Sequence, residues 1–170
     1  MRCPLAEGRT QVVFGTGSPT ADLLFVGEGP GAEEDRQGLP FVGRSGQLLD
    51  QLVAEEMGLS RDQCYIANVV KCRPPGNRDP RPDEIAACRP YLDRQLDLID
   101  PRVVVTLGRF SSQLLLDSDI GITKLRGKEY PFRNGVLVPT FHPAAVLRGG
   151  GEPMAQMRAD LVRAKRALSA

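Results

Sequence analysis

Three side chains of this sequence have the chemistry and the surroundings to hold a flat, polar ligand. The first is His142, the single histidine, which stands in Phe-His-Pro-Ala-Ala-Val-Leu-Arg directly after an apolar run. The following proline restricts the backbone there and so fixes where the imidazole points. An imidazole in that place could donate a hydrogen bond to negative charge that develops during a reaction. A partly buried polar residue that ends a strand is an equally good interpretation of the position.

The other two candidates are an amide and an aromatic ring. Asn68 lies among apolar neighbours, where its side chain needs partners or costs the fold about 1–3 kcal/mol. Because an amide offers both a donor and an acceptor, Asn68 could bind the edge of a base bidentately. Phe41 follows Pro40 in a loop of glycine, arginine and serine, where a planar ligand could stack on it with about 1–3 kcal/mol. The plainer alternatives are that Asn68 ties down a neighbouring loop and that Phe41 packs onto the core.

A glycine-rich loop at residues 27–50 joins a Gly-x-Gly-x-Gly turn, an acidic cluster and the start of a helix. The glycines at 27, 29 and 31 are predicted to adopt positive φ and to let a ligand approach the main chain. The loop lacks the Lys-Ser/Thr pair of a phosphate-binding loop and the ribose-binding acid of a dinucleotide site. It therefore indicates a pocket floor of another kind, or a tight turn without a ligand.

The four cysteines are too sparse for a small disulfide-bonded scaffold. The unequal spacing of Cys3, Cys72 and Cys88 suggests an iron–sulfur cluster or a zinc site, although no fourth ligand is evident. Cys64 is expected to face the core as a small hydrophobe. For any one of these thiols, ordinary packing is the alternative.

The net charge of this 170-residue chain is only +1, so binding to a polyanion must come from local patches. No apolar run approaches the roughly 20 residues of a membrane helix, and we expect a soluble, intracellular protein. Basic residues gather in one loop and near the C-terminus, where solvated surfaces are the alternative to phosphate binding. The two groups are Lys71, Arg73, Arg78 and Arg81, and Arg148, Arg158, Arg163, Lys165 and Arg166.

Strands and helices alternate along the chain, which predicts an α/β fold with a parallel sheet covered on both faces. A ligand site is then expected at the carboxyl ends of the strands. We expect one domain over residues 1–170, with a turn-rich stretch at 117–135 that could hold a short hairpin. The predicted strands are 21–27, 64–70, 102–108 and 135–141, and the predicted helices are 45–57, 82–99, 110–116 and 153–167.

Five motifs together resemble the iron–sulfur uracil-DNA glycosylases of thermophilic bacteria and archaea, usually called family 4. They are Glu-Gly-Arg-Thr (7–10), Gly-Glu-Gly-Pro-Gly with Glu-Asp and Gly-Leu-Pro-Phe-Val-Gly (27–43), Asn-Val-Val-Lys-Cys-Arg-Pro-Pro (68–75), Val-Thr-Leu-Gly (105–108) and Phe-His-Pro-Ala-Ala-Val-Leu-Arg (141–148). The resemblance runs from Cys3 to the C-terminal helix. It implies a three-layer α/β/α sandwich around a four-stranded parallel sheet. It also implies a base excision repair enzyme that flips uracil out of DNA and hydrolyses its N-glycosidic bond, leaving an abasic site.

The resemblance implies a uracil pocket that contains the residues singled out above. The loop at Glu28, Gly29 and Gly31 would line it, Phe41 would stack on the base and Asn68 would read its edge. Gly29 stands where the best-known glycosylases of the superfamily carry a catalytic aspartate. Catalysis should therefore depend on leaving-group stabilisation and substrate binding more than on a strong general base.

Two catalytic roles follow from the same resemblance. His142 would donate to the uracil O2 while negative charge builds there. Glu34 would either position the attacking water or exclude the methyl group of thymine. Contacts to the DNA are implied for five residues, with 146–148 as a wedge beside the flipped base. These are Lys71, Arg73, Arg78, Leu147 and Arg148.

The implied cofactor is a structural 4Fe-4S cluster held by Cys3, Cys72 and Cys88. The family's N-terminal Cys-x-x-Cys places the fourth cysteine immediately before Met1, so we expect that the natural start lies upstream. The implied partner is uracil-containing DNA, single- or double-stranded, and the protein is expected to be a monomer in the prokaryotic cytoplasm, associated with the nucleoid. Two alternatives stay open: a glycosylase for another deaminated base such as hypoxanthine or xanthine, and a uracil-DNA binding module with impaired turnover.

Overall fold

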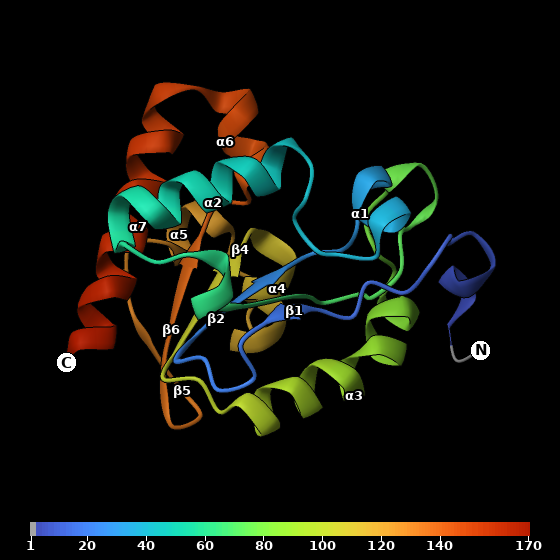
Figure 1. Ribbon diagram of the computed structural model, residues 1–170, viewed down its shortest axis with the longest axis horizontal. Coiled ribbons are helices and arrows are strands. Elements are labelled where there is room, and N and C mark those ends of the chain that lie inside the picture. Colours follow the sequence, from blue (N-terminus) through green and yellow to red (C-terminus); the bar gives the residue numbers. More distant parts are fainter. Residues whose placement is uncertain (1–2) are drawn as a thin grey trace.

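The computed structural model describes residues 3–170 and is built on a mixed sheet of six strands in the order β1-β3-β2-β4-β6-β5 (Figure 1). The four central strands are parallel, whereas β1 pairs antiparallel with β3 and β5 pairs antiparallel with β6. The predicted parallel sheet is thus confirmed, and two short antiparallel edge strands extend it. The strands are β1 (Thr16–Gly17), β2 (Leu23–Gly27), β3 (Tyr65–Asn68), β4 (Val103–Leu107), β5 (Tyr130–Phe132) and β6 (Gly135–Thr140).

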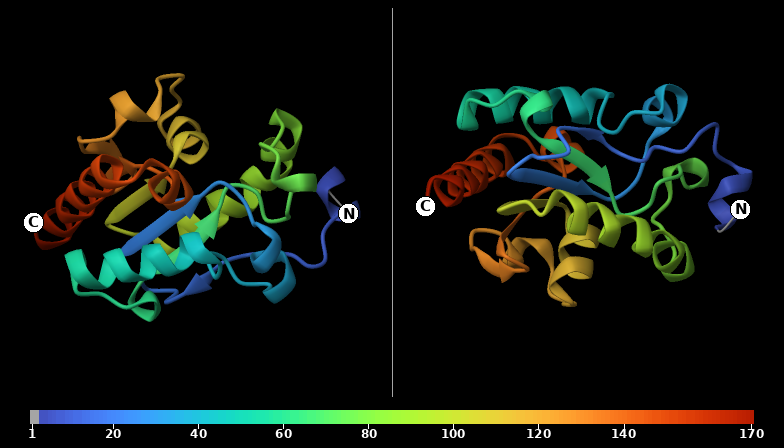
Figure 2. Two further views of the ribbon diagram at one scale, coloured as in Figure 1. Left: turned by 90° about the horizontal axis from the view of Figure 1, so that it is seen from above. Right: turned by 60° about the horizontal axis from the view of Figure 1, so that its bottom comes forward.

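Helices cover both faces of the sheet, which confirms the α/β/α layering (Figure 2). Helices α2, α6 and α7 pack on one face, where Leu52, Val146 and Leu161 are buried. Helix α3 supplies Leu92 and Leu96 to the other face. The helices are α1 (Ala32–Gln37), α2 (Arg44–Met57), α3 (Pro82–Ile99), α4 (Arg109–Leu116), α5 (Ile122–Leu125), α6 (Pro143–Gly149) and α7 (Gly151–Ser169), with 3-10 turns η1 (Pro4–Glu7), η2 (Arg61–Gln63) and η3 (Pro75–Asn77).

The central strands form where the sequence is continuously apolar. Every residue of β2 and of β4 is buried, as expected for parallel strands covered on two faces. The predicted hairpin is also present, because β5 and β6 pair across a turn at Arg133 and Asn134. Among the described residues, no helix has the length and apolar character needed to cross a bilayer.

Of the short helices that were not predicted, α1 and α6 lie beside the expected ligand site. Helix α1 interrupts the glycine-rich loop, and its acidic cluster forms the first turn, where carboxylates interact favourably with the helix dipole. Helix α6 follows β6 directly and begins at Pro143, a residue suited to the first position of a helix. These helices carry Glu34 and Arg148, so they place predicted site residues.

Candidate active site

The predicted ligand residues come together at the carboxyl ends of β2, β3 and β6. Glu28 follows β2, Asn68 ends β3 and His142 lies two residues after β6. Together with Phe41 and residues of α1 and α6, they line a cavity of about 550 Å³, here called the strand-end cavity. The predicted residues that line it are Glu28, Gly29, Gly31, Glu34, Phe41, Asn68, Arg78, His142 and Arg148.

Gly27, Gly29 and Gly31 provide space but do not adopt the positive φ that the sequence suggested for them. A Cβ atom on Gly27 would lie 2.5 Å from both Phe41 Cζ and Asn68 Oδ1. A Cβ atom on Gly29 would lie 2.6 Å from Val70 Cγ2. The missing side chains therefore let the loop pack against the residues that form the cavity.

Phe41 forms a wall of the cavity and also packs on the core, so both interpretations of this residue hold. Its side chain is 5% exposed, and its ring centroid lies 5.5 Å from that of His142 at an interplanar angle of 31°. The backbone of Phe41 has a φ of +53°, a strained value for a bulky residue. Arg61 holds this conformation by donating to the carbonyl oxygens of Pro40, at 2.7 Å, and of Phe41.

Asn68, which lines the cavity, carries an unsatisfied acceptor. Its side chain is 1% exposed, and Oδ1 has no hydrogen-bond partner among the described residues. A buried acceptor without a partner costs about 1–3 kcal/mol, which a ligand N–H in the cavity would recover. The partner that the sequence led us to expect for the Asn68 side chain is therefore not supplied to Oδ1 by any described residue.

His142 is held in one tautomer by the first turn of α6. Its Nδ1 accepts a hydrogen bond from the main-chain N–H of Ala144 at 3.1 Å, so the proton of the neutral ring resides on Nε2. Burial, aided by the positive charge of Arg148 and opposed by Glu34, lowers the pKa of His142 to about 4. The imidazole is therefore neutral at physiological pH, and its Nε2–H, which has no hydrogen-bond partner among the described residues, can donate to a ligand.

Glu34 organises the loop that surrounds the cavity. Its Oε1 accepts from the main-chain N–H of Gly31 at 3.0 Å, and its Oε2 accepts from those of Val42 and Gly43 at 2.9 and 2.8 Å. One carboxylate thereby joins the start of α1 to the start of α2. Sequence analysis did not foresee this loop-holding role, although Glu at the third position of a helix is a known signal of a capping interaction.

A second carboxylate, that of Glu28, lies in the cavity with an altered pKa. Burial and the charge of Asp79 raise the pKa of Glu28 to about 7, while Arg109 opposes the shift. A carboxyl group with such a pKa is divided between its neutral and ionised forms near neutral pH. It can then donate or accept a hydrogen bond at the mouth of the cavity.

The predicted DNA-contacting residues do not all lie on an accessible surface. Leu147 is 42% exposed, and Arg148, next to it, is also exposed, both on α6 beside the cavity. Arg73 is half-buried and donates from Nε to Asn77 Oδ1 at 2.7 Å. Arg78 lines the cavity but makes a bidentate ion pair with Glu84, at 2.8 and 2.7 Å.

Lys71 does not belong to this surface, contrary to the prediction. Its side chain is 3% exposed, and Nζ donates to Asn68 O at 2.8 Å and to Gln95 Oε1 at 2.6 Å. An ammonium group enclosed in this way cannot reach a phosphate. The position of Lys71 within an arginine-rich loop gave no signal that its side chain turns inward.

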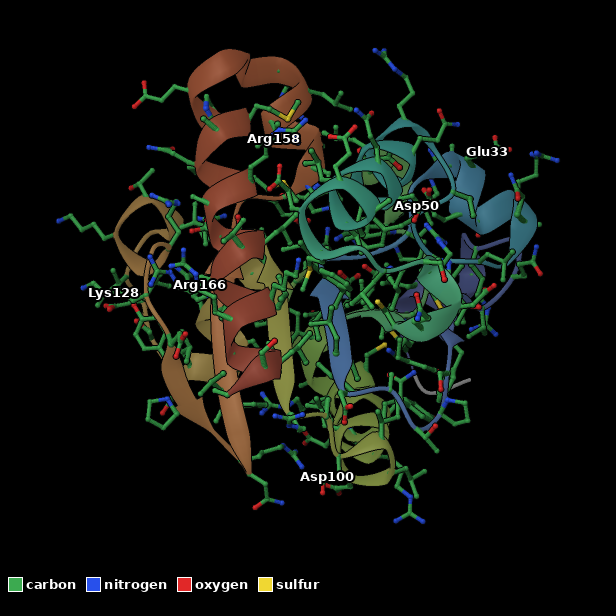
Figure 3. The ribbon with its side chains drawn as sticks, turned by 60° about the vertical axis from the view of Figure 1, so that its left-hand side comes forward. Glu33, Asp50, Asp100, Lys128, Arg158 and Arg166 are labelled. Atoms are coloured by element: carbon green, nitrogen blue, oxygen red, sulfur yellow. The ribbon has the colours of Figure 1, made fainter. Side chains whose placement is uncertain are left out.

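The basic residues near the C-terminus also do not form one patch. Arg158 pairs with Glu55 and Glu56 of α2, each at 2.7 Å. Figure 3 shows Arg158 and Arg166 on different parts of α7, with Arg166 toward Lys128 and the end of the helix. Of the residues in the C-terminal group, only Arg148 lines the strand-end cavity.

The cysteines predicted to bind metal line a second cavity, of about 410 Å³, here called the cysteine cavity. Cys72 Sγ accepts a hydrogen bond from Arg9 at 3.1 Å, and Cys88 Sγ accepts one from the main-chain N–H of Lys71 at 3.4 Å. Cys3, Cys72 and Cys88 are all free of disulfide bonds. N–H donors of this kind commonly surround the sulfur ligands of iron–sulfur clusters.

The arrangement of these cysteines does not decide between the two metal sites that the sequence suggested. Within residues 3–170, no group of three or more Cys, His, Asp or Glu side chains is arranged to hold a metal ion. The iron–sulfur cluster and the zinc site therefore both stay predictions. The fourth ligand, expected immediately before Met1, lies outside the described residues. Cys64 is buried, as predicted.

Comparisons with known proteins identify the family. Residues 14–164 match the Uracil DNA glycosylase superfamily. A type-4 uracil-DNA glycosylase from Sulfurisphaera tokodaii is 51% identical over 154 residues, which cover 86% of this chain and 70% of the relative. This chain belongs to the type-4 uracil-DNA glycosylases. A second type-4 enzyme, from Thermotoga maritima, is 49% identical over 148 residues, covering 86% of this chain and 77% of that relative.

The fold is shared with a solved structure of much lower sequence similarity. A candidate uracil DNA glycosylase from Methanosarcina acetivorans, determined by NMR in solution, superimposes with a TM-score of 0.55. The match covers 95% of this chain and 99% of the other at 12% identity. At that identity the likeness shows the fold alone.

Proposed function

We propose that this chain excises uracil from DNA by drawing the flipped base into the strand-end cavity and hydrolysing its N-glycosidic bond. The observation that carries the proposal is the joint presence, in one cavity, of an aromatic wall, an unsatisfied amide acceptor and a neutral imidazole donor. These belong to Phe41, Asn68 and His142. Its type-4 relatives carry the name of the same activity.

The edge of uracil matches the polar groups of Asn68. Uracil presents an N3–H donor beside the O4 acceptor, and an amide accepts from the first through Oδ1 while donating to the second through Nδ2. Cytosine presents the reverse pattern, an acceptor beside an amino donor. Recognition by Asn68 therefore favours uracil over cytosine, and the flat ring stacks on Phe41.

The imidazole of His142 is suited to the leaving group. Bond cleavage leaves an anionic uracil and an oxocarbenium-like sugar, and a donor aimed at the uracil O2 lowers the barrier. Because His142 is neutral, Nε2–H supplies a hydrogen bond without a preceding proton transfer. Glu34 acts by holding the loop around the base, since both its oxygens already accept main-chain N–H groups.

The DNA would lie across the mouth of the strand-end cavity. Leu147, exposed on α6, is placed to fill the space that the flipped base leaves, and Arg148 and Arg73 to bind phosphates. We propose that one domain and one copy of the chain suffice, with single- and double-stranded DNA both accepted, in association with the nucleoid.

Cys3, Cys72 and Cys88 would hold a 4Fe-4S cluster in the cysteine cavity. Sulfur ligands, a mostly apolar cavity and two N–H donors to sulfur fit such a group. The cluster would supply cross-links, joining the N-terminal segment to the loop after β3 and to α3. The residues of the strand-end cavity perform the reaction.

A base-release assay tests this function. The purified chain is incubated with oligonucleotides that carry one uracil, thymine, hypoxanthine or xanthine, and free base and abasic sites are measured. We expect release of uracil and none of thymine. Release of hypoxanthine or xanthine without uracil would indicate another deaminated base as the substrate. Tight binding of uracil-containing DNA without release would identify a binding module.

A further inference from the structure

Lys71 carries a buried amino group whose hydrogen-bond acceptors are both uncharged. Its Nζ donates to the main-chain oxygen of Asn68 at 2.8 Å and to Gln95 Oε1 at 2.6 Å, and it lies 5.5 Å from the ring centroid of Phe14. Burying an ammonium group against neutral partners is costly, because water would solvate it better. Such a group is expected where function requires it more than stability does.

The partner of Lys71 is itself fixed in place. Gln95 is 4% exposed, and its Nε2 donates to Phe14 O at 2.8 Å and to Tyr65 Oη at 3.2 Å. The amide oxygen of Gln95 is thereby oriented toward Lys71. The ammonium position is determined by this rigid support on one side and by the carbonyl of Asn68 on the other.

The main chain of Lys71 faces the cysteine cavity. Its N–H donates to Cys88 Sγ at 3.4 Å, and its carbonyl accepts from Val13 N at 2.7 Å. Lys71 is also one of the residues that line this cavity. A single residue therefore contacts a predicted cluster ligand through its backbone and, through its side chain, the main chain of Asn68, which lines the strand-end cavity.

The orientation of the Asn68 side-chain amide depends on how its main chain is held. Its Oδ1 has no partner among the described residues, so no contact to that atom fixes the direction of the amide. The peptide group after Asn68 is held from two sides, by Lys71 Nζ on the carbonyl and by Gly27 O on the N–H of Val69, at 2.9 Å. Removing the ammonium group frees one of these two sides.

We propose that Lys71 is a positioning residue that fixes Asn68 for recognition of the base and links the cysteine cavity to the strand-end cavity. This inference rests on the proposed function. It assigns Lys71 no contact with substrate, and it replaces the DNA contact that the sequence suggested. Through Lys71, structural changes in the cysteine cavity then alter the position of the Asn68 amide that recognises the base.

A double-mutant cycle tests the link. Lys71→Met keeps the length of the side chain and removes the ammonium group, and Asn68→Ala removes the amide. We expect Lys71→Met to lower the single-turnover rate of uracil release at least about tenfold, because small displacements of positioning groups have large effects. In the Asn68→Ala background the same change should lower the rate less than about twofold, since it acts through an amide that is no longer there.

Arg158→Met is the matched control, because it removes a cation with the same substitution from the α2–α7 contact. It should leave the rate unchanged in both backgrounds. Affinity for undamaged DNA should also persist in Lys71→Met, which a general loss of structure would abolish. If Lys71→Met does not fold, Gln95→Leu, which removes the second acceptor of Lys71, should give a smaller loss with the same non-additivity.

An NMR measurement separates this inference from the proposed function. The side-chain amide resonance of Asn68 is recorded in the free protein, without DNA, for wild type and Lys71→Met. A clear shift supports the positioning role even if the wild type releases no uracil. An unchanged Asn68 resonance, or a rate loss that is equal in the wild-type and Asn68→Ala backgrounds, would overturn it.

Discussion

One main-chain group sets the tautomer of His142, and burial keeps the ring neutral. The N–H of Ala144 occupies Nδ1, and burial together with Arg148 keeps the pKa of the ring near 4. Protonation of His142 would turn Nδ1 into a donor that faces another donor. The chemistry that we assign to this residue therefore requires the neutral ring.

We predict a pH dependence of stability from this residue. In the unfolded chain His142 titrates near 6.5, whereas in the folded chain it titrates near 4, so between these values the unfolded state binds the extra proton. The contribution of His142 to stability is thus present above pH 6.5 and is lost as the pH falls toward 4. Melting temperatures at pH 4 to 7 should show a shallower slope in His142→Ala. If the melting temperature of His142→Ala depends on pH as steeply as that of the wild type, another group causes the pH dependence of stability.

The main elements were predictable from apolar periodicity, but the short elements at the site were not. The central strands are β-branched and continuously buried, so their pattern has one interpretation. Helix α1 has only six residues and follows a Gly-Pro-Gly turn, a sequence typical of loops. The direction of Lys71 depends on Gln95, a contact with residue 24 positions away that no local pattern reports.

The loop between α1 and α2 supports a prediction about Phe41. Arg61 of η2 holds the carbonyls of Pro40 and Phe41 and also pairs with Asp50 at 3.0 Å. Arg61→Met should release the strained backbone of Phe41 and raise KM for uracil-containing DNA about three- to tenfold, as loss of one stacking platform implies. Steady-state kinetics with Asp50→Asn as the control, which keeps both carbonyl bonds, should show no such rise. Equal effects in the two variants would contradict this role.

At the scale of the whole molecule, the near-zero net charge makes DNA binding a local property. Arg148→Ala should lower the slope of log affinity against log salt by about 1, because one phosphate contact is lost. Arg166→Ala changes a residue of α7 that does not line the strand-end cavity, and it should leave the slope unchanged. Salt titrations with one duplex measure both. If the slope changes only in Arg166→Ala, the DNA binds at the C-terminal end of α7 and not beside the strand-end cavity.

The sequence located the site because the carboxyl ends of parallel strands lie along one edge of the sheet, where ligands bind. It named Phe41, Asn68 and His142, and the structure brings them into one cavity. It did not reveal that Glu34 is bonded to three main-chain N–H groups or that Lys71 is buried. Both facts depend on how loops close over the sheet, which is decided by contacts between distant segments.

The most direct test of the account is a comparison of rate and affinity in His142→Ala. Single-turnover uracil release and the dissociation constant are measured on one uracil-containing duplex. Because loss of one donor to a developing anion typically costs about 10² to 10³ in rate, we predict a fall of that size with less than about a threefold change in affinity. If affinity weakens by the same factor as the rate, His142 binds the ground state and the proposed role in leaving-group stabilisation is wrong.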